Sequence, residues 1–147
     1  MASLAINSFK GRLMGDTAQI ATAINLATDT VKAMLLTASH TTDIDANVFI
    51  SDVSANECPA SGTYSAGGVT LTKTSSTDDT NNWGKFDVAD FSFTTATLSA
   101  RYIAVYKDTG TPATSPVLAI YDLGATVSSY LGTWSAVVNA NGLLTLA

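Results

Sequence analysis

The sequence predicts a mainly β fold, an antiparallel β-sandwich or barrel-like domain with a short N-terminal helix. Thr alone supplies 22 of the 147 residues, and its β-branched side chain favours a pleated, half-solvated surface. Short apolar runs recur between polar turns, without alternating helices after residue 55, as in sandwiches and barrels. The length fits a single domain, residues 1–147, with a helical segment at 1–15 and a β-rich core at 16–147.

The N-terminal segment carries the clearest helical pattern. Ala5, Phe9 and Leu13 recur at helical spacing. Ser3 is a candidate N-cap, and Gly15 is a candidate C-terminal stop. Because so short a helix is marginal alone, we expect it to dock on the sheet or on another subunit.

Two apolar runs follow the helix. Val31–Thr37 predicts a strand with apolar side chains on both faces, and therefore a central position in a sheet. Ile20–Leu26 predicts a weaker strand or an extended approach to it, and Thr28 with Asp29 predicts the turn between the two runs.

Loops are expected to dominate the next part of the chain. His40–Asp45 is polar, Asn47–Ser54 can form one helical turn, and Glu57–Gly62 predicts a surface excursion. Ser65–Gly68 has two adjacent glycines but lacks the lysine of a phosphate loop and the third glycine of a dinucleotide-binding loop. It therefore predicts a turn or bulge before a strand.

Period-two alternation predicts half-buried antiparallel strands in the rest of the chain. Val69 and Leu71 alternate with Thr70, Thr72 and Thr74, Phe86 and Val88 show the same spacing, and Phe91 and Phe93 alternate with Ser92 and Thr94. Ser75–Asn82 between these strands predicts an exposed hairpin loop. The apolar runs Ala100–Tyr106 and Ser115–Tyr121 predict a hairpin in the core of the sheet.

The last two predicted strands are Tyr130–Val138 and Leu143–Leu146. They are joined by Asn139–Gly142, whose Asn-Gly end favours a tight turn.

The charge pattern limits the classes of partner. Net charge is −5, and the seven Lys and Arg residues are scattered, so no basic stripe is present to bind nucleic acid. No apolar run reaches the 18 residues expected of a membrane span, and residues 1–15 lack the basic-then-apolar order of a signal peptide. We expect a protein made in a reducing cytosol that contacts neither membrane nor nucleic acid directly.

Candidate reactive groups are few. Cys58 is the single cysteine and His40 the single histidine. We interpret Cys58 as a small buried or half-buried hydrophobe and His40 as a solvated loop residue, since adjacent Ser and His do not make a triad. We therefore expect no enzyme, no catalytic residue and no cofactor.

The acidic stretch Asp78–Asp90 has a partial resemblance to a calcium loop. Counting from Asp79, oxygen ligands or glycine fall at three expected positions, Asn81, Gly84 and Asp90. Trp83 occupies the fifth position instead of a ligand. A polar hairpin loop without a metal is the favoured interpretation, and ion binding there is left open.

Two tryptophans, Trp83 and Trp134, could stack on a sugar, as in a carbohydrate-binding module. Core packing is the favoured interpretation of both.

Four segments in this order resemble a family of small tailed-bacteriophage virion structural proteins. They are Asp29–Thr37, Tyr64–Thr72, Ser99–Gly110 and Ser115–Gly124. The resemblance spans nearly the whole chain, includes no catalytic motif, and implies a role in the virion after synthesis in the bacterial cytoplasm.

Within that family, a compact acidic domain fits a capsid decoration or cement protein that binds the outer surface of the head through many repeated contacts. The expected partners are the major capsid protein or other virion proteins, and a homo-oligomer, by analogy a trimer. A neck, tail or fibre-associated component is the alternative, and a carbohydrate-binding module is the second. We expect the N-terminal segment with Leu4, Ile6 and Phe9, or an exposed sheet edge, to mediate docking or self-association.

Overall fold

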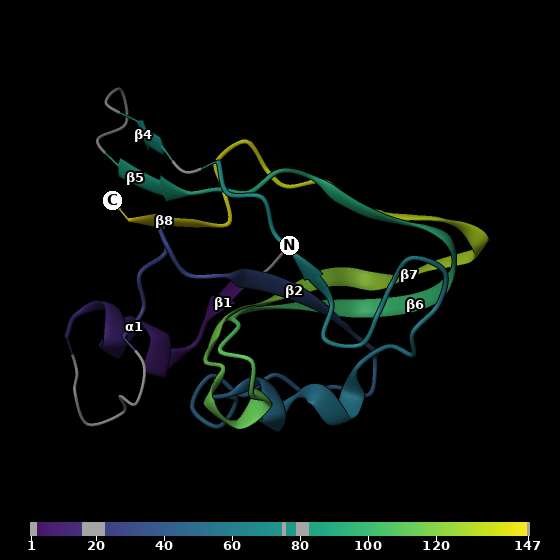
Figure 1. Ribbon diagram of the computed structural model, residues 1–147, viewed down its shortest axis with the longest axis horizontal. Helices are drawn as coiled ribbons and strands as arrows, with labels where there is room; N and C mark the ends of the chain where they lie inside the picture. The colour runs from purple at the N-terminus through teal and green to yellow at the C-terminus, as the bar shows by residue number, and fades with distance from the viewer. Residues whose placement is uncertain (1–2, 16–22, 75, 79–82, 147) are drawn as a thin grey trace.

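The computed structural model describes residues 3–15, 23–74, 76–78 and 83–146 (Figure 1). It confirms a mainly β fold with antiparallel sheets and one short α-helix near the N-terminus. The strands of the five-stranded sheet are, in spatial order, β1 (Ser3–Ala5), β7 (Val117–Ala136), β6 (Phe91–Lys107), β2 (Val31–Leu36) and β3 (Val69–Thr70). Those of the three-stranded sheet are β4 (Ser76–Asp78), β5 (Trp83–Phe86) and β8 (Leu144–Leu146).

A long, bent two-stranded ribbon dominates the molecule. Strands β6 and β7 span 17 and 20 residues and stay paired from Phe91 opposite Ala136 to Tyr106 opposite Val117. Figure 1 shows this ribbon turning back over itself. We call residues 102–107 and 117–122 the lower arm, and residues 91–96 and 132–136 the upper arm. The predicted core hairpin is confirmed as the lower arm.

The bend has a local backbone cause. The strand register shifts between Phe93 and Ala96 and again between Ala96 and Leu98, and such bulges increase local bending and twist. Thr95 and Leu131 adopt φ values of 52° and 47°, which are uncommon for residues with a side chain. The predicted strand Tyr130–Val138 therefore continues β7 instead of forming a separate strand.

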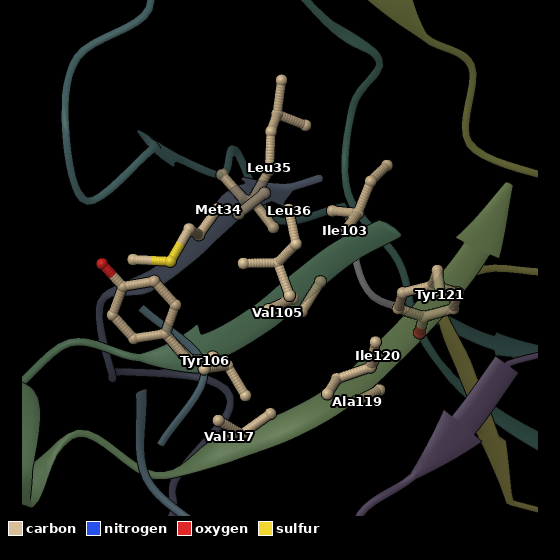
Figure 2. Packing of buried hydrophobic residues seen from close by; sticks show 14 of the residues in the cluster. Met34, Leu35, Leu36, Ile103, Val105, Tyr106, Val117, Ala119, Ile120 and Tyr121 are labelled. Atoms are coloured by element: carbon tan, nitrogen blue, oxygen red, sulfur yellow. The ribbon is translucent and has the colours of Figure 1, made fainter. Parts of the chain in front are cut away.

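The core lies on both faces of the five-stranded sheet. Leu35 and Leu36 in β2 point to opposite faces (Figure 2), and both are fully buried. The upper arm packs on one face, with Phe93 and Trp134 buried in the same hydrophobic cluster. The segment between β2 and β3 lies along the other face (Figure 1). The prediction that Val31–Thr37 is a strand buried on both sides is thus confirmed.

The N-terminal segment docks on the chain's own sheet. Its helix α1 spans Asn7–Leu13, while Ser3 pairs with Tyr121 in β1, so Ser3 is not the N-cap and the predicted helix start was wrong. Gly15 has φ 86°, which fits the predicted stop. Ile6 and Phe9 are buried in the chain's own core, whereas Leu4 is 44% exposed, and docking of this segment to another molecule stays a prediction.

Residues 23–25 form no strand, so in this part of Ile20–Leu26 the alternative prediction, an extended approach to β2, is the one that remains; residues 20–22 lie outside the described residues. The Lys107 side chain instead fastens the chain at Ala23 and Asp29. Lys107 Nζ donates to the Ala23 carbonyl at 2.7 Å and lies 2.9 Å from Asp29 Oδ1. The predicted turn at Thr28 and Asp29 is confirmed by their amides donating to the Asn25 carbonyl.

The segment after β2 contains two short 3-10 turns, η1 (Ile50–Asp52) and η2 (Ser54–Asn56), where one helical turn was predicted. The surface excursion predicted at Glu57–Gly62 is wrong at its start. Cys58 is 2% exposed, and its amide donates to the Leu35 carbonyl at 2.9 Å. A third turn, η3 (Pro112–Thr114), lies in the loop between β6 and β7.

The C-terminal strands pair differently from the prediction. The Gly142 amide donates to the Asn139 carbonyl at 2.8 Å, which confirms the tight turn. The strands on either side of that turn do not form a hairpin, because β8 pairs with β5 in the smaller sheet. The predicted loop Ser75–Asn82 is shortened by β4, which pairs with β5; residues 75 and 79–82 lie outside the described part.

Candidate functional site

An apolar cavity of about 570 Å³ opens between the two arms of the ribbon. Ile103 and Tyr121 of the lower arm line one side, and Phe91 and Val137 line the other. The Tyr121 hydroxyl donates to the Leu143 carbonyl, and burial raises the pKa of this tyrosine. Most of the wall is apolar and can take an apolar group, and the polar side chains in the lining are those of Tyr121, Ser135, Asn139 and Asn141.

A second, smaller pocket of about 280 Å³ has mixed walls. It is lined by Leu4, His40, Thr41, Thr42, Tyr102, Ile120 and Asp122. These residues come from β1, the loop after β2, β6 and β7. They have no motif spacing, because strand pairing and the packing of the loop after β2 bring them together, so sequence reasoning did not find this pocket.

His40 is buried, with 4% of its surface exposed, and the expectation of a solvated histidine was wrong. Its ring lies edge-on to Tyr102, with centroids 5.4 Å apart. The Nε2 atom is buried without a hydrogen-bond partner. Burial lowers the pKa of His40 below its ordinary 6.5, because a buried site disfavours the charged ring. The neutral imidazole therefore packs the loop after β2 against the Tyr102 ring.

An ion pair borders this pocket. Arg101 Nε lies 2.8 Å from Asp122 Oδ1, and the Arg101 guanidinium also stacks 5.6 Å from the centre of the Tyr102 ring. A hydrogen bond from the Gly124 amide lowers the pKa of Asp122, and Arg101 adds to the effect. Asp122 is thus held as a carboxylate whose oxygens already have partners.

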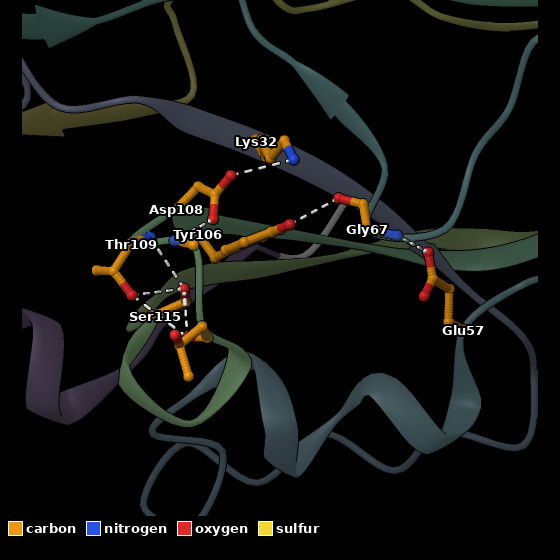
Figure 3. Close-up of polar contacts among 9 residues, drawn as sticks. Lys32, Glu57, Gly67, Tyr106, Asp108, Thr109 and Ser115 are labelled. Carbon is orange, nitrogen blue, oxygen red and sulfur yellow. Dashed lines mark hydrogen bonds and ion pairs between the residues drawn. The ribbon is translucent and has the colours of Figure 1, made fainter.

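Glu57 organises the glycine-rich turn at residues 65–68. Its Oε1 accepts hydrogen bonds from the Tyr64 hydroxyl at 2.8 Å and from the Gly67 amide at 2.7 Å. The Gly67 carbonyl accepts from the Tyr106 hydroxyl at 2.6 Å (Figure 3). Burial raises the pKa of Tyr106 to about 12. Gly67 and Gly68 have positive φ before β3, which confirms a structural turn.

Cys58 is buried, as its interpretation as a small hydrophobe required. Its Sγ lies 3.4 Å from the Ser99 carbonyl. Burial raises the pKa of the thiol to about 11, and the neighbouring Glu57 adds to the shift. Since the thiolate is the reactive form, Cys58 is suited to packing rather than nucleophilic attack.

The calcium-loop hypothesis rests partly on residues 79–82, which lie outside the described part of the chain. Two of its carboxylates have backbone partners: Asp87 Oδ1 accepts from the Val88 amide, and Asp90 Oδ1 accepts from the Val138 amide at 2.7 Å. Among the described residues, no group of three or more His, Cys, Asp or Glu could hold a metal ion.

Trp134 is 2% exposed, which confirms its packing role. Its indole ring lies 6.1 Å from the Phe93 ring, so it offers no free face to a sugar. The side chain of Trp83 lies outside the described residues.

Comparisons of the chain with protein-family models, with curated proteins and with solved structures found no match. In the described residues, no helix is long and apolar enough to cross a membrane.

Proposed function

We propose that this chain is a structural protein of a tailed-phage virion, a decoration or cement protein that binds the outer surface of the head. Its partner is the major capsid protein, and its activity is stabilisation of the shell by repeated protein contacts rather than catalysis.

The observation that carries the proposal is the placement of the four segments resembling virion proteins. Asp29–Thr37 contains β2, and Tyr64–Thr72 contains the Glu57-bound turn and β3. Ser99–Gly110 and Ser115–Gly124 contain the lower arm of the ribbon. The four segments are therefore neighbours in one sheet of this chain, in the order β7-β6-β2-β3.

The polar groups inside this scaffold support an assembly role. Thr109, Thr114 and Ser115 bond with one another in the loop between β6 and β7 (Figure 3). Asp108 lies 3.1 Å from Lys32 and accepts from the Gly110 amide. Such contacts rigidify loops, and a rigid surface loses little conformational entropy when it binds a partner.

The test is to count copies of the chain in purified virions of the phage that encodes it, by quantitative mass spectrometry. Hundreds of copies per particle support head decoration. Six or twelve copies place the chain at the neck or tail, and absence from the particle overturns the proposal. Addition of the purified protein to heads made without it, followed by heating, then measures whether the shell gains stability.

A further inference from the structure

The upper arm and the bend of the ribbon are built from uncharged residues. Residues 91–100 and 123–138 include no charged residue, although the chain carries a net charge of −5. Four exposed large apolar side chains gather there: Val127 at 40% exposure, Tyr130 at 82%, Leu131 at 66% and Val137 at 77%. A grouping of this kind on one surface is typical of a protein-binding site.

This surface includes an unpaired strand edge. Strand β7 pairs with β1 only from Ala119 to Tyr121, and no other described strand lies on that edge up to Ala136. The opposite edge of the upper arm is covered, since Thr63 bonds the Thr94 backbone and the Ser61 hydroxyl accepts from the Thr97 amide. The open edge of β7 therefore presents free backbone donors and acceptors.

We propose that this edge of β7 pairs with the same edge of a second copy of the chain, about a two-fold axis. The site offers a partner two features at once, an open strand edge and a neutral apolar surface. A second copy presents both, and the two uncharged surfaces meet without the repulsion that the remaining acidic surface would cause. A two-fold axis also makes the paired strands antiparallel.

The register of the proposed pair brings together the exposed apolar residues at the two ends of the upper arm, Leu131 and Val137. Leu131, Thr133, Ser135 and Val137 are exposed, whereas Trp134 between them is buried. An axis beside Trp134 places Leu131 of one copy opposite Val137 of the other. Facing apolar side chains of this kind stabilise paired strands, and Val137 also lines the cavity between the arms.

Sedimentation velocity of the full chain over a range of concentrations tests the proposal. We expect a monomer–dimer equilibrium. Leu131→Lys or Val137→Glu alone should raise the dissociation constant about tenfold or more, because each replaces an apolar contact with an unpaired charge. The control is Met14→Lys, an 88% exposed residue after α1, which should change nothing.

The double variant Leu131→Lys with Val137→Glu distinguishes pairing in this register from nonspecific association of apolar surfaces. Six residues along a strand span about 20 Å, so the introduced charges meet only between copies. We expect the double variant to recover dimerisation to within about threefold of the parent chain. Thermal unfolding of each variant checks that the fold is intact.

Three results overturn the proposal: a chain that stays monomeric up to about 1 mM, a trimer, or a folded double variant no more associated than its single variants. The measurement uses the isolated chain and does not depend on capsid binding, so this proposal and the virion role can fail separately.

Discussion

The indole Nε1 of Trp134 donates a hydrogen bond to the backbone carbonyl of Val127, with 3.1 Å between the two atoms. The two residues lie on either side of Leu131, where the backbone of β7 takes its left-handed φ. One side chain thus fastens the upper arm to the strand segment before the bend.

Replacing Trp134 should therefore destabilise the whole fold. Trp134→Phe leaves the Val127 carbonyl without its donor, and we expect the free energy of unfolding to fall by about 1–3 kcal/mol. Trp134→Ala should cost about 3–5 kcal/mol because it also empties a core position. Urea denaturation measures both. Met14→Ala, at an 88% exposed site, is the control, and a Trp134→Phe variant as stable as that control would contradict the role of the bond.

Alanine substitutions at Gly68 and Gly110 compare a crowded position with an open one. Both have positive φ, 77° and 84°, so alanine at either should cost about 1–2 kcal/mol in backbone strain. At Gly68 an added Cβ would also lie 1.8 Å from the Ala33 carbonyl oxygen, whereas at Gly110 it meets nothing. We expect Gly68→Ala to be clearly the more destabilising in thermal unfolding. Equal losses would mean that the turn before β3 does not press against β2.

Glu57 and Tyr64 should be energetically coupled. Glu57→Ala removes the acceptor of the Tyr64 hydroxyl and the Gly67 amide, while Tyr64→Phe removes one of those donors. In a double-mutant cycle we expect a coupling free energy of about 0.5–3 kcal/mol between the two substitutions. Strict additivity would show that the Glu57–Tyr64 bond contributes nothing to stability.

His40 should give the fold a pH dependence near neutrality. Burial lowers its folded-state pKa below 6.5, so the unfolded chain binds the proton more readily. The stability due to the neutral ring is present above pH 6.5 and is lost as the pH falls through the folded pKa. Asp108 and Asp122, whose pKa values are lowered from 3.8, lose their contributions only in more acidic solution.

The measurement is the free energy of unfolding from about pH 7.5 to pH 5, a range in which histidine is the side chain that ordinarily titrates. The parent chain should lose stability across this range, and His40→Asn should lose markedly less. A parallel decline in both would assign the effect to other groups.

Local patterns predicted those features that depend on neighbours in sequence. Alternation and β-branched content placed β2 and the lower arm, and the glycines and Asn-Gly placed the turns at residues 65–68 and 139–142. Contacts between distant residues were missed. His40 was expected in solvent because its neighbours are polar, but Tyr102, 62 positions later, covers its ring. The His40 pocket was missed for the same reason.

By itself the sequence determined the mainly β content and the small number of reactive groups, because composition and period-two patterns act residue by residue. Only the tertiary structure decided that β6 and β7 are continuous through a bend and that β8 pairs with β5 instead of with β7, the strand before it in the chain. It also decided that Ile6 and Phe9 are buried in the chain's own core. Strand pairing joins residues far apart in the chain, so its register and its free edges follow from competition among all the strands and not from any one segment.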